Sequence, residues 1–298
     1  MTGRILNSIG TTIRPRNRRP RRKIFRLVRA GKIWLSAGAL CLALPVFAAP
    51  EPWQVWREHN PESTRRVDHT AWQRFLEVFV VAGEDGINRV AYQQARADAG
   101  PDLQRYLQEL AAIDPRTLTR DQQMAYWINL YNALTVDVVL RHPGKQSIRR
   151  MGQGFFSFGP WDDALLSVAG IAMTLNDIEH RILRPIWQDQ RIHYAVNCAS
   201  LGCPNLSQTA YTAENLNRQL SEAEKTYLRH PRGVSFDSRG RLQLSSIFEW
   251  YREDFAETEQ GLLEYLAQHH PEAERLLEYQ GRISYRYDWQ LNALTNSQ

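Results

Sequence analysis

The stretch RDQQMAYWINLYNALTVDVVLRHPG, residues 120–144, predicts the helix around which this fold is built. Apolar residues at helical spacing form one face: Met124, Trp127, Ile128, Tyr131, Leu134 and Val138. Further apolar residues fill much of the remaining surface: Leu130, Ala133, Val136 and Val139. A helix that is apolar nearly all round is buried in a protein core. We therefore expect this helix at the centre of the fold.

Two asparagines, Asn129 and Asn132, lie within this apolar helix. A buried amide must find hydrogen-bond partners, because burying it unpaired costs free energy. Such amides either hold neighbouring backbone segments in place or form the wall of a binding site. Both interpretations stay open, and both residues are candidate binding residues.

The rest of the chain predicts further helices and a few short strands. Helices are expected at residues 68–83, 102–113, 175–187, 213–228, 245–255 and 259–279. Strands are expected in hairpins turning at Ala169-Gly170 and Arg239-Gly240, at residues 191–197 and at residues 282–289. Two-residue turns imply antiparallel pairing, so we predict an α+β fold, a helix-dominated single domain with a small, mostly antiparallel sheet.

Charge is distributed unevenly along the 298 residues, whose formal net charge is +5. Residues 1–48 hold eleven Lys or Arg and no Asp or Glu. The remaining 250 residues carry 26 basic and 32 acidic side chains, a net charge of −6. A basic surface that would attract nucleic-acid phosphates is therefore not indicated, and we predict no nucleic-acid partner.

The basic N-terminus precedes the fifteen-residue apolar run IWLSAGALCLALPVF and then Ala48. This pattern is typical of a secretory signal peptide, and the run is shorter than the roughly 20 residues that span a bilayer. We predict a signal peptide at 1–48, a linker or arm at 49–66, an N-terminal helical part at 67–113 and a core domain at 114–292. The expected protein is exported, periplasmic or secreted, without a stable membrane span after cleavage.

The helix predicted at residues 175–187 carries polar residues among apolar ones. Thr174 and Asp177 have the spacing of a capping box, which opens a helix. Glu179 falls inside the apolar stripe, where an ionised carboxylate needs a partner or a catalytic role. His180 lies at the edge of that stripe, within helical reach of Arg184. These residues form either a structural ion-pair cluster or part of an active site.

Cys198 stands at the end of the predicted strand 191–197, where a rigid scaffold gives way to a loop. A thiol needs a base or a positive neighbour to become a thiolate near neutral pH. His180, or else His193, can serve as that base, with Glu179 fixing the imidazole. The candidate catalytic residues are therefore Cys198, His180 and Glu179.

Cys203 allows three competing interpretations of this segment. In an exported chain, Cys198 and Cys203 can form a small-loop disulfide. The two cysteines with His193 and His180 can bind zinc, although their spacing matches no common zinc motif. Finally, Cys203-Pro204 can simply open a loop. We predict no metal and no cofactor. No phosphate-binding glycine loop of the kind that holds a nucleotide opens any of the predicted helices.

Five blocks, taken in order, resemble the domain-of-unknown-function family 547: AYWINLYNALT, LNDIEHRILR, RIHYAVNCASLGCPNL, IFEWYREDF and YRYDWQLN. The resemblance spans roughly residues 114–292. The family's signature positions fall here on Trp127, Asn129, Tyr131, Asn132, Asp177, Glu179, His180, Arg184, His193, Asn197, Cys198, Trp250, Asp254, Asp288, Trp289 and Asn292. The resemblance implies a polar site where the Glu179-His180 helix meets Asn197-Cys198.

A cysteine with a histidine and a carboxylate is similar in kind to papain-like and transglutaminase-like enzymes, and the fold is expected to be at most distantly related to theirs. The order along this chain, Glu then His then Cys, differs from the Cys-first order of papain. We expect a cysteine-dependent hydrolase or acyltransferase acting on an amide or thioester of a small-molecule or peptide substrate. Asn197 or Asn129 is the expected oxyanion donor. Candidate binding residues are Asn129, Asn132, Arg184, His193 and Asn197. The alternative is a non-catalytic periplasmic binding or interaction module with a Cys198–Cys203 disulfide.

Overall fold

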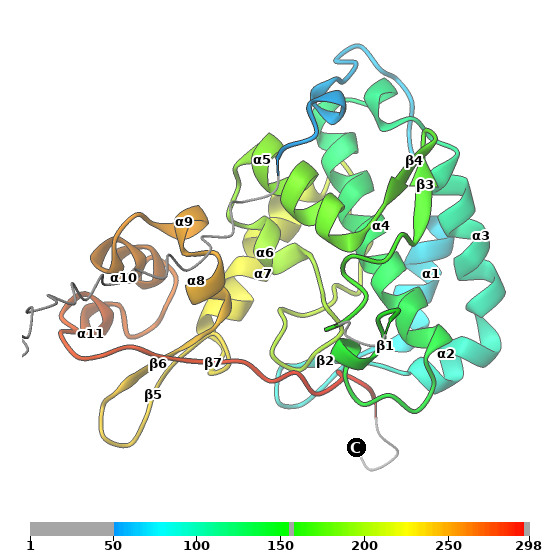
Figure 1. Cartoon of the computed structure of the whole chain (residues 1–298). Coiled ribbons are helices and arrows are strands. Elements are labelled where there is room, and N and C mark those ends of the chain that lie inside the picture. The colour runs from blue at the N-terminus through cyan, green and yellow to red at the C-terminus, as the bar shows by residue number, and fades with distance from the viewer. Residues whose placement is uncertain (1–50, 155–157, 295–298) are drawn as a thin grey trace, which may run out of the picture. The chain divides into compact units, whose positions relative to one another are not determined.

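Helix α4, Arg120–Arg141, lies at the centre of the larger of two hydrophobic cores, as predicted (Figure 1). The computed structural model describes residues 51–154 and 158–294, so the signal peptide predicted at 1–48 lies outside the described residues. Thr119 caps α4, and every residue from Gln123 to Leu140 is buried. The all-round apolar pattern of this helix therefore follows from packing on all its sides.

The larger core contains α4 and the elements around it. These elements, in chain order, are η1 (Gln54–Arg57), α1 (Thr70–Phe79), β1 (Val80–Ala82), β2 (Asn88–Val90), α2 (Tyr92–Asp98), α3 (Gly100–Ala111), η2 (Pro115–Thr117), η3 (Ile148–Arg150), β3 (Leu166–Val168), β4 (Ile171–Met173), η4 (Asp177–Leu183), α5 (Arg184–Trp187) and α6 (Ile192–Ala195). Residues 51–66, predicted as a linker or arm, dock here through Trp56. Its side chain is fully buried, and its ring lies edge-on to Trp127 at 5.3 Å.

A smaller core forms from the C-terminal part of the chain (Figure 1). Its elements are α7 (Leu216–Arg229), β5 (Val234–Phe236), β6 (Leu242–Ser245), α8 (Ile247–Trp250), α9 (Arg252–Phe255), α10 (Glu259–Ala267), α11 (Ala273–Leu277) and β7 (Ser284–Arg286). Helix α7 contributes to both cores, Leu216 to the larger and Tyr227 to the smaller. The chain then returns to the larger core, where Leu291 pairs with Ser200 in an isolated bridge.

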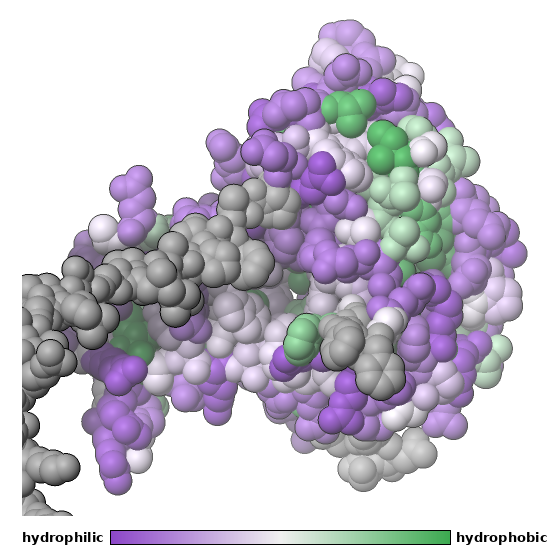
Figure 2. All heavy atoms as spheres, in the orientation of Figure 1, coloured by the Kyte–Doolittle hydropathy of each residue, from purple (hydrophilic) through white to green (hydrophobic). Residues whose placement is uncertain are grey.

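The predicted α+β class is confirmed, and helices dominate. The strands of the described residues form three small sheets instead of one: β1–β2, β3–β4 and β5–β6–β7. The two predicted hairpins are β3–β4 and β5–β6, both antiparallel, whereas β7 pairs parallel to β6. The hairpin β1–β2 replaces the end of the helix predicted at 68–83. Figure 2 shows a mostly hydrophilic face with a hydrophobic area over β3–β4.

The strand predicted at residues 191–197 was wrong: Ile192–Ala195 forms the short helix α6. All residues from Ile192 to Asn197 are buried. Ile192 packs in the larger core and Tyr194 in the smaller one. Apolar residues of this segment therefore point into two different cores. Their alternation with polar residues resembles a half-exposed strand, although no side of the segment faces water. His193 lies in a helical turn and does not alternate with its neighbours between two faces of a strand.

The predicted capping box is present at the start of the segment that carries Glu179. The backbone N–H of Asp177 donates to Oγ1 of Thr174 at 3.0 Å, and the backbone N–H of Thr174 donates to Oδ2 of Asp177 at 3.1 Å. The following turns, Asp177–Leu183, form a π-helix. Such wide turns occur often at functional sites. Here the wider turn buries both Ile178 and Glu179.

Replacing Thr174 with Ala is expected to lower the free energy of unfolding by about 1 kcal/mol, because the cap accepts an otherwise unpaired N–H. Urea denaturation followed by circular dichroism measures this loss. Thr226→Ala, at an exposed position inside α7, is the matched control and is expected to change stability by less than about 0.5 kcal/mol. Equal effects of the two substitutions would contradict the assigned cap.

Among the described residues, no helix combines the length and the apolar character needed to cross a bilayer.

Candidate functional site

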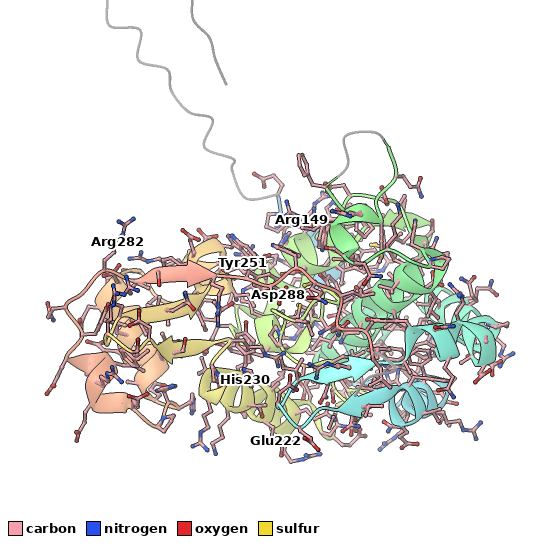
Figure 3. All side chains as sticks on the ribbon, turned by 90° about the horizontal axis from the view of Figure 1, so that it is seen from below. Arg149, Glu222, His230, Tyr251, Arg282 and Asp288 are labelled. Atoms are coloured by element: carbon pink, nitrogen blue, oxygen red, sulfur yellow. The ribbon has the colours of Figure 1, made fainter. Side chains whose placement is uncertain are left out.

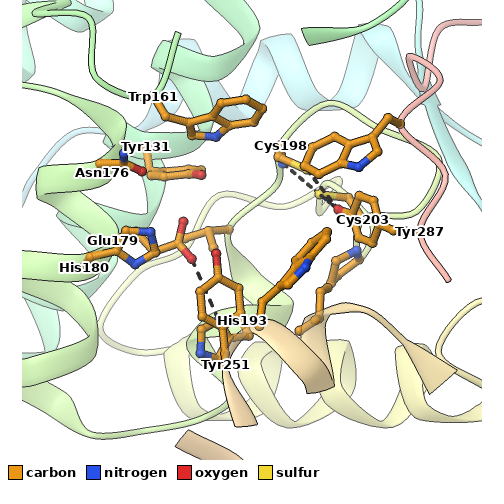
Figure 4. Close-up of a pocket in the computed structure, with 15 residues that line it drawn as sticks. Tyr131, Trp161, Asn176, Glu179, His180, His193, Cys198, Cys203, Tyr251 and Tyr287 are labelled. Carbon is orange, nitrogen blue, oxygen red and sulfur yellow. Dashed lines mark hydrogen bonds and ion pairs between the residues drawn. The ribbon is translucent and has the colours of Figure 1, made fainter. Parts of the chain in front are cut away.

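A cavity of about 250 Å³ lies where the two cores meet (Figure 4). One side is formed by α4, η4 and α6, and the other by α8 and the chain after β7. The polar side chains on its wall include the predicted catalytic residues Cys198, His180 and Glu179, together with His193 and Cys203. The fold therefore brings the predicted triad to one cavity, although the three residues do not form a hydrogen-bonded chain.

The cysteine side of the cavity is a small network of sulfur and hydroxyl groups. The two cysteines among the described residues are free thiols, with Cys203 buried and Cys198 half-buried. Sγ of Cys198 lies 3.0 Å from Oη of Tyr287 and 3.2 Å from Oγ of Ser200. The backbone N–H of Cys198 donates to Sγ of Cys203 at 2.9 Å, and the Tyr287 hydroxyl donates to the same sulfur at 3.1 Å. These contacts hold the two thiols side by side.

These contacts distinguish the two thiols electrostatically. Burial and the neighbouring Cys203 raise the pKa of the Cys198 thiol well above its usual value. Burial alone would also raise the pKa of Cys203, but the hydrogen bonds from Cys198 and Tyr287 outweigh burial and lower it. Cys203 is therefore the thiol of the pair that ionises first, and Cys198 carries the proton when one thiolate is present.

The turn that presents Cys198 is backbone-strained. Ala199 has a φ of 56°, in the left-handed region that residues other than glycine rarely occupy. The amide of Asn197 holds this turn, since its Oδ1 accepts from the N–H of Ala199 at 2.8 Å and its Nδ2 donates to the carbonyl of Pro204 at 2.7 Å. Strained turns of this kind cluster at functional sites, where the surrounding structure maintains them.

On the opposite side of the cavity, His193 lies beside Glu179 (Figure 4) and connects to charged groups of the neighbouring hollow. Nε2 of His193 lies 2.6 Å from Oδ2 of Asp254, and the same carboxylate oxygen accepts from Nε of Arg184. Burial alone would raise the pKa of Asp254, but the hydrogen bonds from His193 and Arg184 outweigh burial and lower it to about 2. Because an ionised carboxylate only accepts, Nε2 of His193 carries the shared proton, and Nδ1 faces Glu179 at 3.8 Å.

His180 has a different partner from the one predicted. Nη1 of Arg184 donates to Nδ1 of His180 at 3.3 Å, so the neutral imidazole has its proton on Nε2. Burial lowers the pKa of His180, which favours this neutral form. Glu179 makes no hydrogen bond to His180 in the structure. The imidazole near the Glu179 carboxylate is thus that of His193, which lies on another helix.

The asparagines predicted as binding residues hold the backbone of the site. Asn129 donates to and accepts from the backbone of Tyr211. Asn132 donates to the carbonyl of Ala195 and accepts the N–H of Asn197. None of Asn129, Asn132 and Asn197 lines the cavity. Arg184 lines a neighbouring hollow, which it shares with His180 and Asp254.

Several residues of the site were not among the predicted site residues: Ser200, Tyr251, Asp254 and Tyr287. Asp254 occupies one of the signature positions of the resembling family, which was the signal that could have identified it. Tyr251 stacks on His193 at 4.3 Å, and Figure 3 shows it between the elements of the two cores. Tyr251 and Tyr287 come from segments far along the chain from Cys198, so sequence spacing gives no indication of their contacts. Among the described residues, no group of three or more His, Cys, Asp or Glu side chains is placed to hold a metal ion.

The segment that contains most of these residues matches a known protein family. Residues 115–228 match the model of the family described as "Protein of unknown function, DUF547". The resemblance to DUF547 is confirmed over this segment, which runs from η2 to α7 and includes Glu179, His193 and both cysteines. The match is shorter than the roughly 114–292 inferred from sequence, so Asp254 and Tyr287 lie beyond the matched DUF547 segment. No curated protein and no solved structure matches this chain. The papain-like or transglutaminase-like relationship therefore stays a prediction.

Proposed function

We propose that this protein is a cysteine-dependent hydrolase or acyltransferase that acts on an amide or thioester in the exported compartment predicted from its leader. One observation carries the proposal. A thiol on a strained turn and an imidazole lie on the wall of the same cavity of about 250 Å³, and the imidazole is hydrogen-bonded to a carboxylate that lines the neighbouring hollow. Nucleophile, base and orienting carboxylate are the recurring components of acyl-transfer sites.

In the proposed reaction, Cys198 attacks the carbonyl carbon and its proton passes to the sulfur of Cys203. Cys203 can take this proton because it is the ionised sulfur when the pair holds one thiolate, and hydrogen bonds from the Cys198 N–H and from Tyr287 keep it beside Cys198. The resulting acyl–enzyme is a thioester on Cys198. Compared with the sequence prediction, the proton on Cys198 moves to a neighbouring sulfur and not to a histidine.

Nδ1 of His193 is the proposed base for the attacking water or amine, and the proton taken up by Cys203 passes on to the leaving group. Asp254 fixes the tautomer of His193 through the 2.6 Å contact, and Arg184 holds Asp254 in turn. His180, predicted for this role, has its Nδ1 occupied by Arg184. The pair His193 and Asp254 therefore replaces His180 and Glu179 in the proposed mechanism.

Tyr287 is the proposed oxyanion donor in place of Asn197 or Asn129. The amides of both asparagines are committed to the backbone. The Tyr287 hydroxyl lies 3.0 Å from Sγ of Cys198, and burial raises its pKa well above the usual value, so it stays protonated. Its single proton is donated to Cys203 in the structure, so it can turn to the oxyanion once Cys203 has taken the proton of Cys198.

The experiment that tests the proposal traps the acyl–enzyme. The reduced protein is mixed with a panel of acyl thioesters and activated amides, quenched in acid and weighed intact. We expect one added acyl group, located on Cys198 within the tryptic peptide 192–218, and no addition after alkylation with iodoacetamide. Unfolded protein in urea is the control for non-specific acylation. Absence of an adduct with every donor, or equal labelling of the unfolded chain, would rule the proposal out.

A further inference from the structure

Neither the packing of the fold nor the proposed reaction explains why the Glu179 carboxylate lies in the cavity wall. The side chain is only 8% exposed, yet its carboxylate accepts no hydrogen bond from any described residue. Its one ion-pair contact is to Nδ1 of His193 at 3.8 Å, and His193 is already bound to Asp254 at 2.6 Å. A buried carboxylate without hydrogen bonds is costly unless another group pairs with it.

The remaining charges near Glu179 are already committed elsewhere. Arg184 is bound to Asp254 and contacts Glu253. His180 accepts a hydrogen bond from Arg184, and burial favours its neutral form. Among the described residues, the cavity therefore contains a carboxylate without a hydrogen-bonded cation of its own.

Aromatic rings form most of the remaining cavity wall. They include Tyr131 and Trp161 from the larger core, Tyr251 and Trp250 at α8, and Trp289 near the C-terminus. Trp161 and Trp289 meet at an interplanar angle of 75° with their ring centres 5.7 Å apart, so their faces point in different directions. Figure 4 shows Tyr131, Trp161 and Tyr251 around the side of the cavity that contains Glu179. Tyr251 already stacks on His193 and carries the Arg184 guanidinium, and Arg149 lies over Trp289. Of these five rings of the wall, Tyr131, Trp161 and Trp250 have no cation of their own among the described residues. The electron-rich face of such a ring attracts a cation.

We propose that the cavity binds an alkylammonium group, with Glu179 as its counter-ion and the tryptophan and tyrosine rings as its walls. An ammonium has three N–H donors and can therefore reach both the Glu179 carboxylate and Nδ1 of His193. A neutral sugar would leave the carboxylate without a counter-ion, and an anion would be repelled by it. A cation-binding aromatic cage with one carboxylate accounts both for the unpaired Glu179 and for the aromatic rings of the wall.

This inference extends the proposed function by naming its substrate class. In acyl transfer, the group bound at Glu179 is a primary amine of the lysine side-chain type, acting as acceptor. One ammonium proton passes to His193 and then to solvent, and the amine nitrogen attacks the thioester carbon. The C–N bond forms, the C–S bond breaks, and the sulfur of Cys198 takes the second proton from nitrogen. The products are an amide and the free thiol.

The test measures binding and does not depend on turnover. Titrations of the full-length reduced protein with n-butylamine, 1-butanol and butyrate are followed by tryptophan fluorescence and calorimetry. We expect n-butylamine to bind about tenfold or more tightly than the neutral or anionic analogue, since only the cation pairs with Glu179. Equal affinity for 1-butanol and n-butylamine would overturn the inference.

Substitutions locate the site. Glu179→Gln is expected to weaken n-butylamine binding about tenfold, and Trp250→Leu about threefold through loss of one ring face. Trp250 is 45% exposed, so this second variant should stay folded even if Glu179→Gln does not. Glu222→Gln is the control, because Glu222 is 61% exposed and lies at the edge of the molecule, away from Tyr251 (Figure 3).

Unchanged amine affinity in a folded Glu179→Gln or Trp250→Leu variant would refute the site. Amine binding without acyl–enzyme formation would remove the proposed function and leave this inference standing.

Discussion

Replacing Cys198 with Ala is expected to lower kcat/KM for acyl transfer by about 10⁴-fold or more, because no other group on the cavity wall can form the thioester in its place. Cys203 lies against the same network but is only 3% exposed, which keeps it from reaching a bound carbonyl. The melting temperature should change little, since the Cys198 side chain is half-buried and makes no more than weak sulfur hydrogen bonds. Steady-state kinetics and thermal denaturation, both in reductant, measure the two effects.

The alternative of a structural disulfide predicts the opposite pattern for this substitution. A bridged protein would lose stability in Cys198→Ala and would have no activity to lose. Intact mass of the mature protein, which lacks Cys41 of the predicted leader, distinguishes the redox states after alkylation without reductant. Two added alkyl groups mean two free thiols, and none means a bridge. Cys198→Ser is the matched variant, since it preserves a hydroxyl beside Tyr287 and Ser200 but removes the sulfur nucleophile. Activity retained in both variants would contradict Cys198 as the nucleophile.

The sequence predicted the parts of this site that depend on local pattern. An all-round apolar helix has to be central, and that burial argument already marked Asn129 and Asn132 as amides in need of partners. The capping box at Thr174 and Asp177 needs only a four-residue window. Glu179 stood out for the same reason, because a carboxylate inside an apolar stripe is conspicuous without any knowledge of the fold.

The contacts that assemble the site could not be predicted from local sequence patterns. His193 was assigned to a strand because α6 is one turn long and too short to show a helical period. Asp254 is 61 residues from His193, and Tyr287 is 89 residues from Cys198, so only tertiary folding brings them together. The π-helix also changes which residues of η4 share a side, a geometry that a 3.6-residue period does not represent. For these reasons no sequence pattern indicates that Glu179 lies beside His193.

Asn132→Ala is expected to lower the free energy of unfolding by about 4 kcal/mol, because two backbone groups lose their partner in a buried place. The Asn132 side chain donates to the carbonyl of Ala195 at 2.9 Å and accepts the N–H of Asn197 at 2.8 Å. Each buried backbone group left unpaired costs roughly 1–3 kcal/mol, and the missing amide adds a small cavity. The same bonds fix the entry to the Cys198 turn, so activity should fall further than unfolding alone explains.

Thr135→Val on the same helix is the control for Asn132→Ala. Thr135 is equally buried, but its hydroxyl has no hydrogen-bond partner among the described residues, and valine has nearly the same shape. We expect this substitution to leave stability unchanged or slightly increased, since it removes an unpaired polar atom without opening a cavity. Urea denaturation monitored by circular dichroism gives both free energies by linear extrapolation. A decrease in the free energy of unfolding below about 1 kcal/mol in Asn132→Ala would contradict this assignment. It would mean that water replaces the amide and that packing alone holds the Cys198 turn against α4.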